Sequence, residues 1–151
     1  MSIAGNHSRI GKKDESRTGE RLDDLVEWYL HARLAGNPRI TIGYGDKIDP
    51  TMYLLRVRGL TYVGIHGDYD AGISALRTAN MPDEPVYAIL TGHLHHNKYD
   101  SEQDVVTVMA GSFLGTDRYA ANRRLKSRPE QIVCVCSDKG IESAHFVALN
   151  Y

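Results

Sequence analysis

From residue 39 onward, the chain is a succession of short apolar runs separated by turns that contain glycine or proline. Runs of about four to eight residues rich in Val, Ile, Leu and Tyr and bounded by such turns are typical of β-strands. These runs predict strands at 39–45, 52–59, 60–67, 85–92, 104–112, 131–138 and 141–150. The sequence SDKG between the last two predicts a tight hairpin. A chain with so many strands must build its core around β-sheets.

Two segments instead show the spacing of a helix. Residues 18–38 place apolar side chains three and four positions apart, with Thr18 able to cap the start and Gly36 and Pro38 able to end it. A shorter helix is predicted at 71–80. Strands combined with these helices predict an α/β fold.

Length and composition limit the organisation of the chain. With 151 residues, 42% hydrophobic, and no repeat or linker-like stretch, we expect a single domain over 1–151. The formal net charge of −1 gives no global electrostatic argument for a nucleic-acid partner. No run approaches the roughly 18 apolar residues of a membrane span, and the first residues do not resemble a signal peptide. We therefore expect a soluble, cytoplasmic protein with no membrane partner.

Two cysteines, Cys134 and Cys136, alternate within a predicted strand and should point to the same face. Side chains two apart on one strand are poorly placed for a disulfide. We interpret them as two small buried side chains, with a Cys-x-Cys metal site as the weaker alternative.

Histidines follow three of the predicted strand ends, each close to a glycine: in IAGNHSR, YVGIHGD and AILTGHLHH. Strand ends converge in α/β sheets, so we expect these turns to share one site. Asn6 offers an amide oxygen, and His66, His93 and His95 offer imidazole nitrogens, a mixed set that suits Zn²⁺, Mn²⁺ or Fe better than Ca²⁺. For any one turn alone, solvated loop histidines would be the better interpretation.

The sequences GNH, HGD and GHLH, in this order, resemble the last three metal-site motifs of the calcineurin-like metallophosphoesterases. The stretch GSFLGTDRYAANRRLKSRPEQIVCVCSDKGI also resembles the tail of a phage and bacterial branch of that superfamily. The resemblance implies a sandwich of mixed β-sheets flanked by helices. It also implies the metal-dependent hydrolysis of phosphate mono- or diesters by two divalent ions.

Carried over to this chain, the resemblance assigns Asn6, His66 and His93 to one metal ion and His95 to the other. It makes His7 the catalytic histidine that stabilises or protonates the leaving oxygen. Two cations about 3.5–4 Å apart would stabilise both the attacking and the departing oxygen.

Other residues near the histidine turns have weaker assignments. Arg9 is a candidate contact for the substrate phosphate, with an exposed arginine as the alternative. Asp68 is a candidate to orient the His66 ring. We expect His96 to be exposed, and His31 and His145 to be ordinary surface or packing residues.

The family pattern begins with a D-x-H and a GDxxD motif before GNH, and this sequence has neither in that place. The sequences GDKID at 45–49 and GDYDA at 67–71 follow GNH, so we do not expect them to substitute. The resemblance therefore implies a partial sandwich without its N-terminal strands and an incomplete pair of metals. We expect a complementing N-terminal chain, or a homo-oligomer, to complete it.

Two further hypotheses remain at this point. The chain could be an inactive remnant of such an enzyme that acts as a binding module. It could also bind nucleic acid through the basic segment DRYAANRRLKSRP, since cations beside an aromatic residue can hold a phosphate backbone. The basic residues are Arg118, Arg123, Arg124, Lys126 and Arg128, next to Tyr119. A solvated loop is the alternative for this segment.

Overall fold

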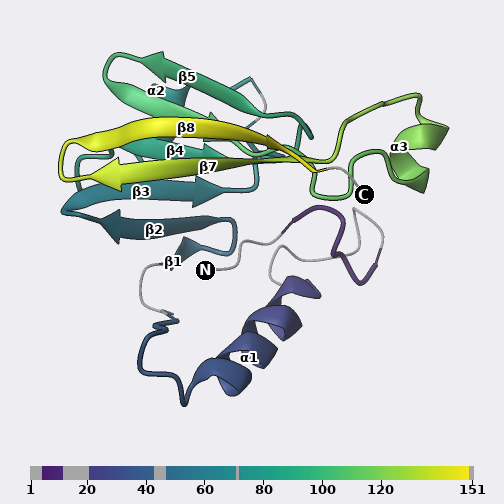
Figure 1. The fold of residues 1–151 in the computed structure, drawn as a ribbon, viewed down its shortest axis with the longest axis horizontal. Helices are drawn as coiled ribbons and strands as arrows, with labels where there is room; N and C mark the ends of the chain where they lie inside the picture. Colours follow the sequence, from purple (N-terminus) through teal and green to yellow (C-terminus); the bar gives the residue numbers. More distant parts are fainter. Residues whose placement is uncertain (1–4, 12–20, 43–46, 71, 150–151) are drawn as a thin grey trace.

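The computed structural model of the chain describes residues 5–11, 21–42, 47–70 and 72–149 (Figure 1). The helices are α1 (Asp23–Leu34), α2 (Ala75–Ala79) and α3 (Arg118–Asn122). The strands are β1 (Lys47–Asp49), β2 (Met52–Val57), β3 (Leu60–Ile65), β4 (Ala88–Thr91), β5 (Lys98–Glu102), β6 (Val105–Met109), β7 (Glu130–Ser137) and β8 (Gly140–Ala148).

Six of these strands form a mixed sheet in the order β1-β2-β3-β4-β6-β5. The neighbours β3–β4 and β4–β6 are parallel, whereas the other pairs are antiparallel. The carboxyl ends of β3, β4 and β6 therefore meet at one edge of the sheet. The loops that follow these three strands begin side by side, and this edge carries two of the predicted histidine turns.

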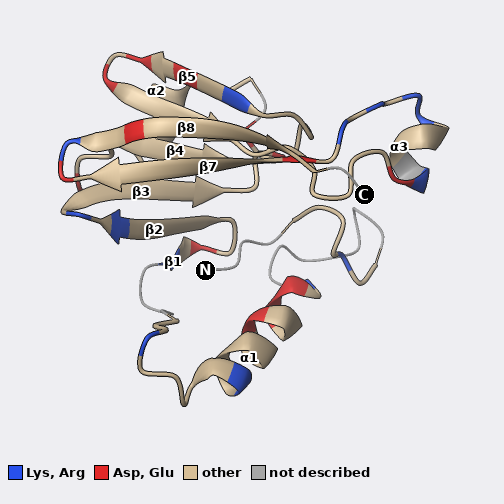
Figure 2. Cartoon of the chain, viewed as in Figure 1, with Lys and Arg blue, Asp and Glu red and all other residues tan. Residues whose placement is uncertain are grey.

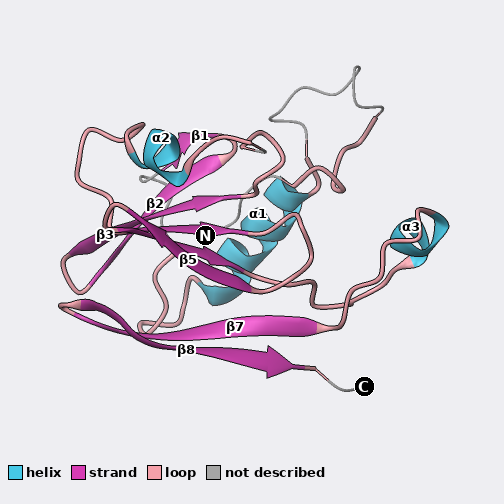
Figure 3. Ribbon diagram, turned by 90° about the horizontal axis from the view of Figure 1, so that it is seen from above, coloured by secondary structure: helices cyan, strands magenta, loops and turns pink. Residues whose placement is uncertain are grey.

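A second sheet of two antiparallel strands, β7 and β8, forms a separate layer against one face of the larger sheet (Figure 3). Apolar side chains alternate along the central strands, so the larger sheet has a core on each face. The face toward β7–β8 buries Tyr62, Ala88, Val106 and Val108, packed with Ile132, Cys134, Cys136 and Ile141. The opposite face buries Met52, Val63, Ile65, Ile89 and Val105, with Ala79 of α2. The predicted α/β class, with mixed sheets flanked by helices, is confirmed.

Helix α1 lies beside the β1–β2 side of the sheet (Figure 1). Its Glu27 is only 6% exposed, and both carboxylate oxygens accept from the Tyr53 hydroxyl on β2, at 3.2 and 3.4 Å. Most of its large apolar side chains are nevertheless exposed, including Trp28 at 65%. The helix is therefore held to the sheet mainly through this buried polar contact.

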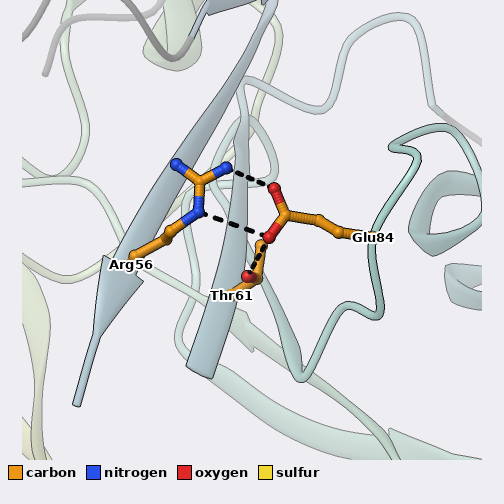
Figure 4. A network of polar contacts seen from close by, with 3 residues as sticks. All are labelled: Arg56, Thr61 and Glu84. Atoms are coloured by element: carbon orange, nitrogen blue, oxygen red, sulfur yellow. Dashed lines mark hydrogen bonds and ion pairs between the residues drawn. The ribbon is translucent and has the colours of Figure 1, made fainter. Parts of the chain in front are cut away.

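The loop between α2 and β4 is tied to the sheet by Glu84 (Figure 4). Its carboxylate accepts from the Arg56 guanidinium on β2, with Nε 3.3 Å from Oε2, and from the Thr61 hydroxyl on β3, at 2.7 Å. One carboxylate thus bridges two strands and the loop.

Three predictions of secondary structure need correction. Residues 39–42 are not a strand, and 43–45 lie outside the described residues; the first strand, β1, begins at Lys47. The long helix begins only at Asp23, since Arg21 and Leu22 are described and are not helical, and it ends at Leu34; the Thr18 cap lies outside the described residues. Strand β5 was not predicted, because its sequence KYDSE is polar and all five residues are exposed. It exists because it pairs with β6 as an edge strand, where charged residues are common.

None of the helices in the described ranges has the length and apolar character needed to cross a membrane.

Candidate metal and phosphate site

The parallel pairing of β3 and β4 places His66 next to His93, 27 positions later in the chain. The backbone N–H of Gly92 donates to the carbonyl oxygen of His66 at 3.1 Å, which joins the two loops where they leave the sheet. The ring centroids of His66 and His93 are 5.2 Å apart, with 70° between the ring planes. The turns after these two strands therefore converge, as the sequence predicts.

Gly67 is required for this convergence. Its φ is +108°, and a Cβ atom at this position would lie 2.7 Å from the hydroxyl oxygen of Thr91. A side chain there would meet both backbone strain and a steric clash. The glycine lets the β3 turn approach the end of β4 closely.

The segment before α1 brings Asn6 to the same point. The Oδ1 atom of Asn6 lies 2.9 Å from Nε2 of His66, and the Gly5 backbone packs against the His66 ring. The segment is anchored by Asp23 in the first turn of α1, which accepts from the Gly5 N–H at 2.9 Å and from the Ser8 hydroxyl. Asp23, which lies 17 positions after Asn6 in the chain, therefore holds the segment that carries Asn6.

His7 and His95 form a second pair beside the first. Their ring centroids are 6.0 Å apart, with 72° between the ring planes. His93 and His95 both have positive φ, 69° and 60°, which is uncommon for residues other than glycine. Such backbone conformations cost free energy and tend to occur at functional sites. The histidine loop after β4 is thus held in a conformation that its own residues do not favour.

Burial favours the neutral form of His66. Removal from water lowers the pKa of its imidazole below the ordinary value; nearby Asp68 and Asp23 oppose the shift, while His93 and His7 add to it. A neutral imidazole is the form that binds metals. One carboxylate oxygen of Asp68 is buried without a hydrogen-bond partner. Asp68 therefore acts on His66 through its charge, and it offers an unused acceptor next to the site.

The geometry around His66 fits one ion in part. Two donors in neighbouring positions of an octahedral ion with bonds of about 2.1 Å lie about 3.0 Å apart, close to the observed separation of Asn6 Oδ1 and His66 Nε2. However, among the described residues no group of three or more His, Cys, Asp or Glu side chains is arranged to hold a metal. Asn6, His66 and His93 thus provide two imidazoles and one neutral amide, which is fewer donors than a closed site uses.

Arg9 is hydrogen-bonded to the backbone of the turn that carries Asn6. Its Nε atom donates to the backbone carbonyl oxygen of Asn6 at 2.7 Å, so it stabilises the turn that carries Asn6. Its predicted contact with a substrate phosphate stays a prediction.

The remaining residues singled out from the sequence behave as surface or structural groups. His96 is exposed as predicted, with Nδ1 3.0 Å from the carbonyl oxygen of Leu94. His145 is exposed on β8, next to the Ser143 hydroxyl at 3.1 Å. Cys134 and Cys136 are free thiols on β7 that are half-buried, not fully buried as expected, and pack against the core beneath the strand. In GDKID, Asp49 accepts from the Thr51 N–H and hydroxyl of a turn, at 2.6 and 2.7 Å.

A cavity of about 640 Å³ opens in front of the histidines. Asn6, His7, His93, His95 and His96 line one side, and Arg123, Lys126 and Arg128 line it from the segment after α3. Three of the five basic residues in the segment that could bind nucleic acid therefore share a cavity with Asn6, His93 and His95. The site lies between the sheet edge and that segment.

Sequence reasoning missed Asn97 and Glu130. The N–H of Asn97 donates to Glu130 at 2.8 Å, its Oδ1 accepts from the Gly111 N–H at 2.8 Å, and its Nδ2 donates to the Gln131 carbonyl oxygen at 3.0 Å. These bonds tie the end of the histidine loop to the ends of β6 and β7. Asn97 follows the histidine cluster directly in the sequence, and this position is the signal that could have identified it.

Neither a protein-family model nor a curated protein sequence matches the chain. Among solved structures, a single mutant of Vps29 from Entamoeba histolytica superposes with a TM-score of 0.49 and 14% identity, over 72% of this chain and 67% of that one. A novel archaeal phosphodiesterase superposes with a TM-score of 0.46 and 13% identity, over 66% of this chain and 51% of that one. A predicted phosphoesterase from Streptococcus pneumoniae has a TM-score of 0.38 and 16% identity, over 76% and 68%.

This chain therefore spans about half the length of the archaeal phosphodiesterase and about two thirds of the other two proteins. At these identities and scores, the superpositions are partial. The chemistry must be argued from the residues of the site itself.

Proposed function

We propose that the protein hydrolyses phosphate mono- or diesters with a divalent metal ion bound at Asn6, His66 and His93. The observation that carries this proposal is the meeting of Asn6 Oδ1 and His66 Nε2 at 2.9 Å, with the His93 ring beside them. Three turns distant in sequence converge there with donors of the kinds that Mn²⁺, Zn²⁺ and Fe accept. A bound ion would neutralise charge on phosphoryl oxygens and lower the pKa of a water molecule.

Each residue then has a role that its position supports. His66, whose neutral form is favoured by burial, and His93 would hold the ion through ring nitrogens. His7 lines the cavity 6.0 Å from His95, ring to ring, and donates a proton to the departing oxygen. His95 is the candidate ligand for a second ion.

The proposal includes a completing partner. The donors that converge are neutral, and two dications repel each other unless carboxylates offset their charge. A complementing chain with D-x-H and GDxxD motifs, or a second copy of this chain, would supply carboxylates. We place the reaction in the cytoplasm, where the free thiols of Cys134 and Cys136 would stay reduced.

The test combines metal binding with turnover. Calorimetry with Mn²⁺ should give one site on the wild-type chain, weakened at least about tenfold in His93→Ala. The matched control is His145→Ala, which removes an exposed imidazole from β8. Turnover of bis-p-nitrophenyl phosphate should be low for the chain alone. The rate should rise when a polypeptide carrying the D-x-H and GDxxD motifs is co-expressed. If a second copy completes the site instead, the rate should rise more steeply than in proportion to the protein concentration.

A different outcome would favour the inactive binding module. If His93→Ala and His145→Ala bind Mn²⁺ equally, the convergence of Asn6, His66 and His93 does not make a metal site. If Mn²⁺ binds at one weak site and no partner produces turnover, the chain retains the fold without the reaction.

A further inference from the structure

The cavity in front of the histidines has two chemically different sides. The histidine side is described above. The other side comes from the segment 123–128, which projects from the sheets together with α3 (Figures 1 and 3). In Figure 2, the ribbon of this segment carries the blue of Lys and Arg along much of its length. We call residues 116–128 the basic arm.

Three of the five basic residues of the basic arm line the cavity. Arg123, Lys126 and Arg128 line the cavity, whereas the carboxylate among its lining residues is Glu130. Glu130 Oε1 already accepts from the N–H of Asn97 at 2.8 Å. The cavity therefore has an excess of positive charge, although the whole chain carries a formal net charge of −1. A local excess of this kind attracts an anionic ligand.

The basic arm is held in shape by its own hydrogen bonds. The Thr116 hydroxyl donates to the Ser127 carbonyl oxygen at 3.0 Å and accepts from the Ser127 N–H at 2.9 Å, which closes the base of the arm. Asp117 caps α3 by accepting from the Ala120 N–H at 2.7 Å. Gly115 packs so closely on Pro129 that a Cβ atom would lie 2.8 Å from the proline ring. The cations are therefore presented by an ordered scaffold, which lowers the entropy cost of binding.

The cations are distributed along the arm. Residues 125–129 have no helix or turn assignment, and Lys126 and Arg128 are two positions apart, which places their Cα atoms at most about 7 Å from each other. The two cations are therefore close enough in the chain to contact phosphates of the same strand. The cavity of about 640 Å³ is also large enough for a ligand with several groups.

The remaining lining suits sugars and bases. Leu94 and Leu125 are 57% and 58% exposed and face the same cavity, where they offer apolar contacts. His96, which has no role at the proposed metal site, adds an exposed ring on which an unpaired base can stack. Phosphate contacts from one side and stacking from the other are the features of single-strand binding.

We infer that the substrate is a single-stranded polynucleotide, whose phosphates contact Lys126 and Arg128 while the scissile phosphate lies at the histidines. This inference deepens the proposed function and rests on it for the cleavage step only. Binding along the basic arm requires no metal ion. The two can therefore be tested apart.

The experiment measures binding of a fluorescein-labelled oligodeoxythymidylate of about 12 nucleotides by anisotropy, in EDTA, between about 50 and 200 mM salt. The double variant Lys126→Ala/Arg128→Ala should bind about tenfold more weakly than the wild type. Its plot of log affinity against log salt should be less steep by about 1.4, which is about 0.7 for each lost phosphate contact on a single strand. The matched control Arg33→Ala/Lys139→Ala, which removes two exposed charges away from the cavity, should change affinity less than about twofold.

Three results would overturn the inference. The first is equal weakening in the two double variants, since this would reflect net charge alone. The second is a wild-type affinity that does not depend on salt. The third is competition by thymidine monophosphate or pyrophosphate as strong as that of the oligonucleotide, which would identify a site for a small anion.

A parallel assay with Mn²⁺ and bis-p-nitrophenyl phosphate separates the two proposals. If the protein cleaves this small diester but does not bind the oligonucleotide, the inference of a polynucleotide substrate is wrong and the proposed function stands. Oligonucleotide binding as described, without cleavage of either substrate under any of the completing conditions, supports the binding surface and contradicts the proposed function.

Discussion

His66 Nε2 lies 2.9 Å from Asn6 Oδ1, although 60 positions separate the two residues in the chain. The contact joins the segment before α1 to the end of β3. In the absence of an ion it is a hydrogen bond, in which the His66 N–H donates to the amide oxygen. In the proposed complex both atoms would be donors to the metal, so the Nε2 proton would leave the ring or move to Nδ1. Substitutions of Asn6 therefore test the proposed metal site directly.

Replacing Asn6 by Asp should increase affinity for Mn²⁺ by at least about tenfold. The converging donors are two imidazoles and an amide, and a carboxylate would add negative charge at the same position and size. Calorimetry measures the change. Asn37→Asp, on the exposed turn after α1, adds the same charge away from the site and should leave affinity unchanged. Equal affinities for the two variants would remove Asn6 from the metal site.

Gly67→Ala should destabilise the fold by about 1 to 3 kcal/mol, because a Cβ atom requires the strained φ of +108° and meets the Thr91 hydroxyl at 2.7 Å. Urea unfolding followed by circular dichroism gives the free energy of unfolding. The control is Gly36→Ala, since a Cβ atom there would have no neighbour within 4 Å and the φ is not positive. A Gly67 variant as stable as the control would mean that the two turns do not approach as closely as described.

Asn97→Ala should cost about 1 to 2 kcal/mol of stability, because it leaves the Gly111 N–H and the Gln131 carbonyl oxygen without their partner. It should also weaken Mn²⁺ binding, since the end of the histidine loop loses its anchor. The control is Asn37→Ala, which removes an exposed side chain that accepts from the Arg39 N–H at 3.0 Å and should change stability by less than about 0.5 kcal/mol. Loss of stability without any change in metal affinity would show that Asn97 does not position the site.

The stability of the fold should fall in acid partly through Glu84. Hydrogen bonds from Arg56 and then Thr61 lower the pKa of the Glu84 carboxyl from its ordinary value of about 4.3. The folded state thus binds a proton less readily than the unfolded state, so this stabilisation is present above about pH 4.3 and is lost as pH falls through the lower folded-state pKa. The difference in urea midpoint between the wild type and Glu84→Gln should shrink from pH 6 to pH 3.

Glu142→Gln, on the exposed part of β8, is the charge-matched control for this pH series. It should keep the acid sensitivity of the wild type. A difference between wild type and Glu84→Gln that is constant with pH would contradict a role for the charged carboxylate.

Local patterns in the sequence were sufficient for most strands. The runs that form β2, β3, β4, β6, β7 and β8 are apolar and bounded by turn residues, so propensity and burial favour the same structure. Strand β5 could not be predicted this way, because its residues are polar and its pairing with β6 is a tertiary choice. The strand prediction for residues 39–42 was wrong for the opposite reason. These residues have a strand-like composition, but they have no strand partner in the described structure.

Strand patterns alone place His66 at the end of β3, and His93 and His95 after β4. The meeting of Asn6 with His66 and His93, the pairing of His7 with His95, and the cavity that they share with the basic arm are visible only in the folded chain. Turns and strands follow from local conformational preferences, which a sequence pattern records. The site depends on parallel pairing and on loop contacts between residues far apart in the chain, and no local pattern specifies these.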